Sequence, residues 1–352
     1  MNIYDMLKIL VDRQGSDLHI IAGAQPTFRV NGNLEAIENT PRLTPEQTVA
    51  LINPLLNNEQ RDYVELHKEI DFGYQFGDDG RFRVNVYHAN GALAAALRLI
   101  PRKIRSIDEL KLPDILHQFT AYKQGLVLVT GPTGEGKSTT LAAIIDEINQ
   151  QRSEHILTIE DPIEFVLESK RSIVSQREMN QDTQDWGLAL RSAMREDPDV
   201  VLVGEIRDYE TIASAITVAE TGHLVFTTLH TNTASQTMDR MIDVFPSNQQ
   251  GQIRQQLAGS IKAVVSQRLV PTIDGAQTVV AEVLIANSAI KNLIRESKTH
   301  LMENVIQTSS ADGMILMENS LVDKVRQGVV SKEVARDFSF RPDIFDQLME
   351  GR

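Results

Sequence analysis

The sequence contains no cysteine among its 352 residues. This absence excludes disulfide bonds and cysteine-ligated zinc, and it is typical of proteins in a reducing compartment. Basic residues are also scarce, since 35 Lys and Arg stand against 48 Asp and Glu, a formal net charge of −13. Binding to nucleic-acid phosphates depends on clustered Lys and Arg, so this balance disfavours a non-specific nucleic-acid binder. A local basic channel in an oligomer is still compatible with it.

Long hydrophobic runs are absent too. No window reaches the roughly 20 apolar residues of a membrane-spanning helix. Residues 1–13 lack the basic region followed by an apolar stretch that marks a secretory signal, so we expect neither a membrane span nor an export signal. A hydrophobic content of 41% is that of an ordinary globular protein, and the length leaves room for two domains.

What the sequence does contain is a glycine-rich phosphate-binding loop of the pattern G-x-x-x-x-G-K-[ST]. An apolar run at 126–129 precedes it and a helix-forming run at 140–145 follows it, which is the context that the motif requires. Lys137 would reach the β- and γ-phosphates of ATP, and the Ser138 hydroxyl would ligate its Mg²⁺. The loop consists of Gly131, Pro132, Thr133, Gly134, Glu135, Gly136, Lys137, Ser138 and Thr139.

An apolar strand ending in an acid is the second sign of a nucleotide site. Residues 200–203 are Val-Val-Leu-Val, followed by Gly204 and Glu205. Many P-loop enzymes have Asp at the position of Gly204, so here Glu205 is the candidate general base that orients the attacking water. The alternative is a carboxylate that merely caps the next helix.

Two further polar segments follow predicted strands. Glu160, Asp161 and Glu164 cluster after the run at 156–159, and like charges this close repel unless a cation or a water network compensates them. A Mg²⁺-nucleotide would supply such a cation. We select Glu164 as a candidate catalytic residue; the alternative is a solvated acidic turn. His230 follows the run at 224–228 and is a candidate γ-phosphate sensor, the alternative being a hydrogen-bonding core histidine.

The patterns divide the chain into two domains. Residues 1–100 alternate short strands with helices, with a hairpin turn at 77–80, and predict a small α/β domain with an antiparallel sheet. A basic, proline-led linker is expected at 101–112. Residues 113–352 alternate strands and helices and become mostly helical after 285, which predicts a RecA-like P-loop domain with a largely parallel sheet and a helical C-terminal region.

Together the four stretches at 131–139, 158–165, 200–207 and 221–232 resemble the Walker A, Asp, Walker B and His boxes of the secretion ATPase superfamily. Within it the chain is most similar to the PilT/PilU retraction ATPases of type IV pili. Residues 15–19 and 81–85 resemble that family's PAS-like N-terminal domain. Residues 289–296 resemble its retraction motif, with Lys291 in place of an arginine, and Glu135 replaces a usual serine.

This resemblance implies a cytoplasmic, homohexameric ATPase motor at the inner face of the inner membrane. Nucleotide would sit between the two domains, where Arg81, Arg83 and Arg98 are candidates to close on the phosphates. The implied partners are a membrane platform protein, through which alone the ring would touch the membrane, and a paralogous retraction ATPase. The assembly ATPases of the superfamily carry a four-cysteine zinc site and a longer N-terminal region, and this chain has neither.

Two alternatives stay open. The first is a PilU-like accessory ring whose force depends on a partner motor. The second is a RecA-like nucleic-acid motor, which the acidic balance and the Asp and His boxes disfavour.

Overall fold

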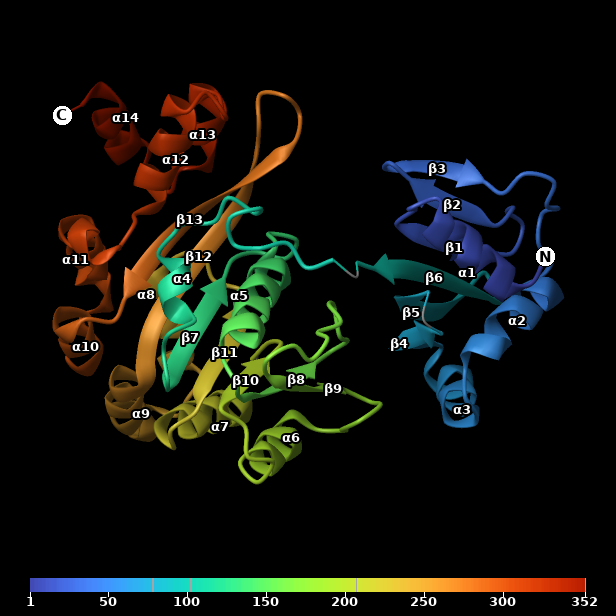
Figure 1. The fold of residues 1–352 in the computed structure, drawn as a ribbon, viewed down its shortest axis with the longest axis horizontal. Coiled ribbons are helices and arrows are strands. Elements are labelled where there is room, and N and C mark those ends of the chain that lie inside the picture. Colours follow the sequence, from blue (N-terminus) through green and yellow to red (C-terminus); the bar gives the residue numbers. More distant parts are fainter. Residues whose placement is uncertain (78, 102, 207, 352) are drawn as a thin grey trace. The chain divides into compact units, whose positions relative to one another are not determined.

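The computed structural model describes residues 1–77, 79–101, 103–206 and 208–351. The chain forms two compact units (Figure 1). The first unit comprises Met1–Lys103 together with two later segments, Asp161–Val166 and Glu178–Asp182. The second unit comprises Ile104–Glu160, Leu167–Arg177 and Thr183–Arg352. The predicted domain bounds stay a prediction. One residue of the predicted linker, Arg102, lies outside the described residues.

The first unit is built on a six-stranded antiparallel sheet, as the sequence predicted. Its strand order is β3-β2-β1-β6-β5-β4. The strands are β1 (Asp17–Ile20), β2 (Thr27–Val30), β3 (Asn33–Ala36), β4 (Glu69–Phe76), β5 (Gly80–Ala89) and β6 (Ala92–Ile100). The predicted turn between β4 and β5 includes Asp78, which lies outside the described residues. Strand β3 was not predicted, because its residues are polar or exposed and show no alternating pattern.

Three helices accompany this sheet: α1 (Ile3–Asp12), α2 (Pro45–Ile52) and α3 (Asn58–His67), with a 3₁₀ turn η1 (Asn53–Leu55) between the last two. Each α-helix begins with a capping box, in which the side chains of the cap residue and of the third helical residue satisfy each other's backbone N–H groups. The cap residues are Asn2, Thr44 and Asn57. The apolar residues of α1 recur at helical spacing, and this face is buried in the core of the unit.

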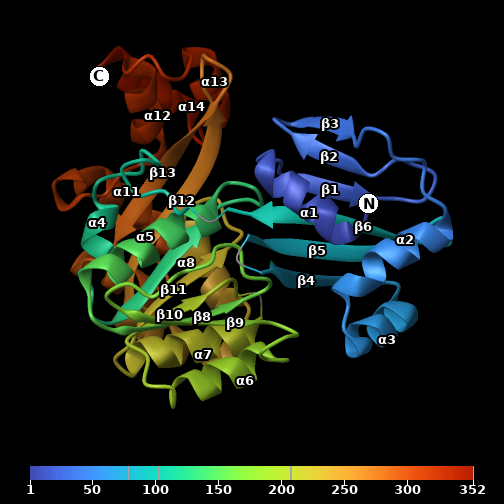
Figure 2. The ribbon, with the colours of Figure 1, turned by 45° about the vertical axis from the view of Figure 1, so that its right-hand side comes forward.

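The second unit contains a seven-stranded sheet of order β13-β12-β7-β11-β10-β8-β9 (Figure 2). Its middle strands run parallel, and β13 joins the edge antiparallel to β12. The strands are β7 (Gly125–Thr130), β8 (His155–Glu160), β9 (Ile173–Glu178), β10 (Val200–Val203), β11 (Leu224–Leu229), β12 (Ile261–Pro271) and β13 (Gln277–Ile285). Every residue of β7, β10 and β11 is buried, so both faces of the sheet are covered.

Helices connect these strands and form the C-terminal region. They are α4 (Leu116–Phe119), α5 (Lys137–Gln151), α6 (Trp186–Ala193), α7 (Tyr209–Glu220), α8 (Ala234–Asp243), α9 (Ser247–Ser260), α10 (Ser288–Arg295), α11 (Met302–Thr308), α12 (Met317–Arg326), α13 (Lys332–Phe338) and α14 (Pro342–Glu350), with 3₁₀ turns η2 (Thr299–Leu301) and η3 (Ser310–Asp312). The predicted α/β order and helical C-terminal region are confirmed. Among the residues described, no helix is both long and apolar enough to cross a bilayer.

Candidate nucleotide site

The phosphate loop joins the end of β7 to the first residue of α5. Its glycines Gly131, Gly134 and Gly136 have φ angles of 145°, 85° and 78°, which side chains rarely allow. A Cβ atom on Gly131 would lie 2.4 Å from the carbonyl oxygen of Gln267. The loop therefore needs its glycines both for its conformation and for its close approach to β12. The backbone N–H groups at the start of α5 supply positive potential for an anion.

Lys137 is the first residue of α5, and its side chain is almost fully buried. Its Nζ donates hydrogen bonds to the carbonyl oxygens of Gly131 and Pro132, each 2.8 Å long. It also lies 3.5 Å from Nδ1 of His230. The ammonium group is thus held against the backbone of the phosphate loop, close to the end of β11.

Glu205 and His230 meet because they follow neighbouring parallel strands. Strands β10 and β11 pair in register, and both end at the same edge of the sheet. Nε2 of His230 lies 3.3 Å from Oε2 of Glu205. Because Nδ1 faces the Lys137 ammonium, a hydrogen-bond donor, the network assigns the ring proton to Nε2, which donates to Glu205. Lys137, His230 and Glu205 therefore form one chain of polar contacts.

The turn after β10 is fixed by its neighbours on both sides. Thr228 donates its hydroxyl to the carbonyl oxygen of Gly204 at 2.7 Å, and the Gly204 N–H donates to Ile159 at 2.8 Å. A Cβ atom on Gly204 would lie 3.4 Å from both the Glu160 Cα and the Ile159 carbonyl oxygen. These distances are ordinary van der Waals contacts, so packing against β8 does not by itself require glycine at this position. The last predicted residue of this box, Arg207, lies outside the described residues.

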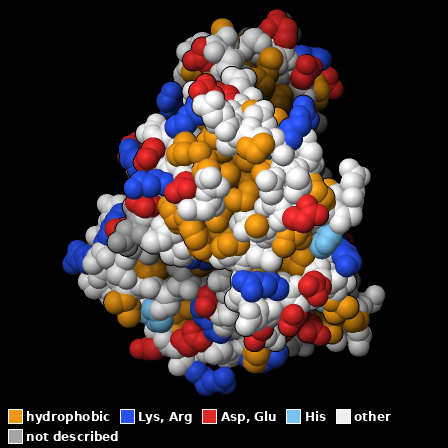
Figure 3. All heavy atoms as spheres, turned by 90° about the vertical axis from the view of Figure 1, so that its right-hand side faces the viewer, with side chains coloured by type: hydrophobic (Ala, Val, Ile, Leu, Met, Phe, Trp, Pro, Cys, Tyr) orange, Lys and Arg blue, Asp and Glu red, His pale blue; other side chains and the backbone are white. Residues whose placement is uncertain are grey.

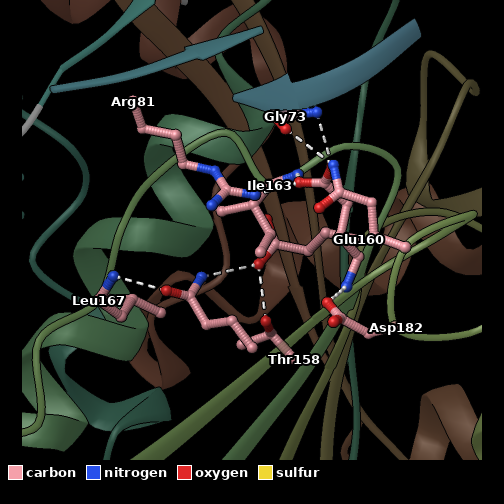
Figure 4. A network of polar contacts seen from close by, with 10 residues as sticks. Gly73, Arg81, Thr158, Glu160, Ile163, Leu167 and Asp182 are labelled. Carbon is pink, nitrogen blue, oxygen red and sulfur yellow. Dashed lines mark hydrogen bonds and ion pairs between the residues drawn. The ribbon is translucent and has the colours of Figure 1, made fainter. Parts of the chain in front are cut away.

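The acidic segment after β8 separates into two environments. Glu160 is nearly buried in the second unit, where it accepts hydrogen bonds from the Thr158 hydroxyl at 2.7 Å and from Gln176 at 3.1 Å (Figure 4). Glu164 belongs to the first unit. Its charge and that of Asp161 add to the effect of Asp71 in raising the pKa of Arg83, for which the Asp71 hydrogen bond is the main cause. The structure therefore places Glu164 near an arginine, and its catalytic role stays a prediction.

Each of the three predicted arginines pairs with a carboxylate of the first unit. Arg81 contacts Glu178 at 2.6 Å, Arg83 contacts Asp71 at 2.5 Å, and Arg98 contacts Asp17 at 2.9 Å. Glu178 is fully buried and also accepts hydrogen bonds from the backbone of Gly73 and Ile163, at 2.6 and 3.2 Å (Figure 4). The role of these arginines against the phosphates stays a prediction.

Three residues with buried polar contacts were missed by the sequence analysis: two beside the phosphate loop and one in the first unit. Gln267 is buried in β12, donates to the Glu135 carbonyl oxygen at 2.6 Å and accepts from the Thr140 hydroxyl at 2.8 Å. Arg268 follows it, and Glu178 is the buried partner of Arg81. The available signal was the polar Ser-Gln-Arg sequence inside an otherwise apolar strand. A buried amide or guanidinium needs hydrogen-bonding partners, so such a sequence indicates a polar neighbour.

A cavity of about 580 Å³ lies in the second unit, and Leu269 of β12 is one of its lining residues. Leu269 lies 3.9 Å from the position of a Cβ atom on Gly136. Arg105 and Lys111 contribute positive charge to the cavity wall, and Glu109 and Asp274 contribute negative charge. The volume lies in the usual range of ligand pockets.

The comparisons with known proteins cover almost the whole chain. A family model described as type II/IV secretion system protein matches residues 2–337. The type IV pilus retraction ATPase PilT of Pseudomonas aeruginosa is 46% identical over 345 residues, which cover 98% of this chain and 100% of that protein. The type IV pilus ATPase PilU of the same organism is 40% identical, over 95% of this chain and 88% of that protein. The crystal structure of the pilus retraction motor PilT with bound ADP superposes with a TM-score of 0.92 at 44% identity, covering 99% of each chain.

Proposed function

Because the chain belongs to the type II/IV secretion system protein family, we propose that it is an ATP-hydrolysing motor that powers the retraction of type IV pili. Its full-length similarity to PilT, and to a PilT structure that holds ADP, supports this function. The observation that carries the chemistry is the convergence of Lys137, His230 and Glu205 at one edge of the parallel sheet, beside the glycine loop.

Nucleotide binding follows from the loop. Its backbone N–H groups and the start of α5 bind the phosphates, and Lys137 exchanges its hydrogen bonds to loop carbonyls for bonds to phosphate oxygens. The site also suits Mg²⁺, since the Ser138 hydroxyl of the phosphate loop is an oxygen donor of the kind that this hard cation prefers. When bound, Mg²⁺ would neutralise charge on the phosphate oxygens.

Hydrolysis requires a group that positions and deprotonates water. Glu205 is only about one-fifth exposed, so its charge is less screened than that of a surface carboxylate. His230 donates to one of its oxygens, which helps to hold the carboxylate in the orientation that a water-activating base needs. His230 also approaches Lys137. In this proposal, loss of the γ-phosphate shifts Lys137, and the His230 ring passes that shift on to Glu205.

Two substitutions test this assignment. Lys137→Ala removes the ammonium from the phosphates, so we expect nucleotide binding to weaken by at least about tenfold. Glu205→Gln preserves the shape but cannot accept a proton, so ATP should stay bound while phosphate release falls by a factor of about 100 or more. Lys123→Ala and Glu210→Gln, which change exposed residues, are the matched controls. Phosphate release by Glu205→Gln at the parental rate would remove Glu205 from the mechanism.

The working form in this proposal is a homohexameric ring, held at the cytoplasmic face of the inner membrane by a platform protein. Large apolar side chains are exposed on the helices of the first unit, including Tyr4, Val49, Tyr63 and Leu66. Hydrophobic side chains also gather in the middle of the face drawn in Figure 3, with charged side chains around them. Apolar exposure of this kind supports contacts with other chains.

A PilU-like accessory role is the second candidate, because PilU is also similar over nearly the full length. The two roles differ in their dependence on a partner. A PilT-like motor retracts pili in cells that lack the paralogue, whereas a PilU-like ring does not. Retraction measured in a strain with this chain as its only retraction ATPase separates them.

A further inference from the structure

Glu135 stands in the phosphate loop, at a position where the related family usually has serine. We propose that it is a positioning residue that fixes the loop to β12, and that Arg268, clamped by Phe338 and Phe340, offsets its charge and so sets the affinity for nucleotide. This inference rests on nucleotide binding at the loop, as proposed above. It adds a link between the C-terminal helices and the phosphate site.

The first observation is a backbone donor that Glu135 satisfies. Strand β12 pairs with β7 as far as Ser266 and Thr130, where β7 ends and the phosphate loop begins. Beyond that point, no strand in the described part of the chain pairs with β12 on the side of β7. The Glu135 carboxylate accepts the hydrogen bond of the Leu269 N–H there, taking the place of a neighbouring strand's carbonyl group. A serine side chain is two bonds shorter and would not span the same distance.

The loop is held to β12 at a second point by Gln267. Its amide donates to the Glu135 carbonyl oxygen, and its own carbonyl accepts from Thr140 in the first turn of α5. Main chain and side chain of Glu135 are therefore both fixed to the same strand. This attachment holds the loop in place before any ligand binds, which lowers the conformational cost of binding.

The second observation is the environment of the Glu135 charge. Its side chain is only 15% exposed, and Nε of Arg268 lies 4.0 Å from Oε1. A negative charge in the loop that binds the phosphates of a nucleotide opposes their binding, and partial burial weakens its screening by salt. Arg268 is the group that compensates it. Without Arg268 the Glu135 carboxylate would repel the ligand that the loop is built to hold.

The third observation connects this ion pair to the C-terminal helices. The Arg268 guanidinium lies over the rings of Phe338 and Phe340, 5.3 and 5.5 Å from their centroids. Phe338 is the last residue of α13, and Phe340 precedes α14. Cation–π contacts on two rings restrict the guanidinium to one position. A movement of α13 and α14 would therefore move Arg268 and change how well it offsets Glu135.

A double-mutant cycle tests this arrangement in the full-length chain. Arg268→Gln should weaken Mg·ADP binding by about fivefold or more, because it leaves the Glu135 charge uncompensated. In the Glu135→Gln background, Arg268→Gln should weaken Mg·ADP binding by less than about twofold. The amide introduced by Glu135→Gln would still accept from the Leu269 N–H but would carry no charge. The pair Phe338→Leu and Phe340→Leu should weaken binding in the parental chain and lose that effect in the Glu135→Gln background. Lys332→Gln, which removes an exposed charge from α13, is the control.

Hydrogen exchange supplies a readout that needs no nucleotide. Glu135→Ser should speed exchange of the Leu269 amide by about tenfold or more, whereas Glu135→Gln should leave it protected. Equal effects of Arg268→Gln with and without the Glu135 carboxylate, or an unchanged Leu269 amide in Glu135→Ser, would overturn the inference while nucleotide still binds. Failure of the parental chain to bind any nucleotide would instead refute the proposed function, and the affinity effect with it.

Discussion

At the scale of single residues, Glu282 shows how burial changes the chemistry of a carboxyl group. This residue of β13 is 1% exposed, and its Oε1 accepts the Ala234 N–H at 2.8 Å. Burial raises its pKa from 4.5 to about 7, with the charges of Glu303 and Glu318 adding to the rise and Arg341 opposing it. Because the folded pKa is raised, the folded state holds a proton between pH 4.5 and 7 that the unfolded state has lost. Stability from this group therefore falls as the pH rises through that window.

Substitution of Glu282 should make the stability of the folded state less dependent on pH. A shift of this size corresponds to about 3 kcal/mol of stability lost by pH 7. Glu282→Gln keeps the carbonyl acceptor and cannot ionise. The unfolding midpoint of the variant should therefore rise relative to that of the parental chain as the pH goes from 5 to 8. Differential scanning calorimetry at several pH values measures this difference. Parallel pH profiles for the two proteins would show that Glu282 does not titrate in this range.

At the scale of elements, α10 is the clearest success of the sequence pattern. The spacing of Ile290, Leu293 and Ile294 in the sequence puts them on one helix face and predicts that they pack inward. In the structure Ile290 and Ile294 are fully buried and Leu293 is partly buried. The pattern could not predict the neighbours of Lys291. Its pKa is lowered, first by burial and then by the positive charges of Lys262 and Arg295. A basic cluster that includes a residue of β12 appears only when the chain has folded.

This cluster is a candidate contact for an acidic partner surface. We predict that Lys291→Glu with Arg295→Glu leaves ring formation and the ATPase rate within about twofold, because Arg295 is exposed and Lys291 is only partly buried. Pilus retraction in cells should nevertheless fail. Lys298→Glu, in the next exposed segment, is the control. Twitching at the parental rate with the double variant would leave α10 without a partner role.

At the scale of the whole molecule, the sequence predicted the residues that follow strand ends, and it missed the contacts between segments that are far apart in the chain. The sequence predicted Glu205 and His230 separately as residues of the nucleotide site, and the structure shows that they meet because their adjacent parallel strands end at one edge. Strands β12 and β13 were not predicted, and with them the contacts of Gln267 and Arg268 to a loop more than 130 residues earlier. No local pattern records such a pairing, since it is fixed by the register of the folded sheet.

The charge of the whole chain makes a separate prediction. With a formal net charge of −13, the protein should show no DNA mobility shift at physiological salt, because phosphate contacts need clustered cations. DNA should also leave the ATPase rate unchanged. Salt-resistant DNA binding together with DNA-stimulated hydrolysis would revive the nucleic-acid motor and argue against a pilus role.

Pilus retraction in living cells, with Glu205→Gln as the only copy of this chain, tests the central claim most directly. The variant keeps its nucleotide site but cannot activate water, so pili should still extend and bind surfaces while the measured retraction force falls to background. The parental chain and Glu210→Gln should both restore normal force. Retraction at the parental speed and force in the Glu205→Gln strain would contradict the account, because ATP hydrolysis at this site would then not drive the movement.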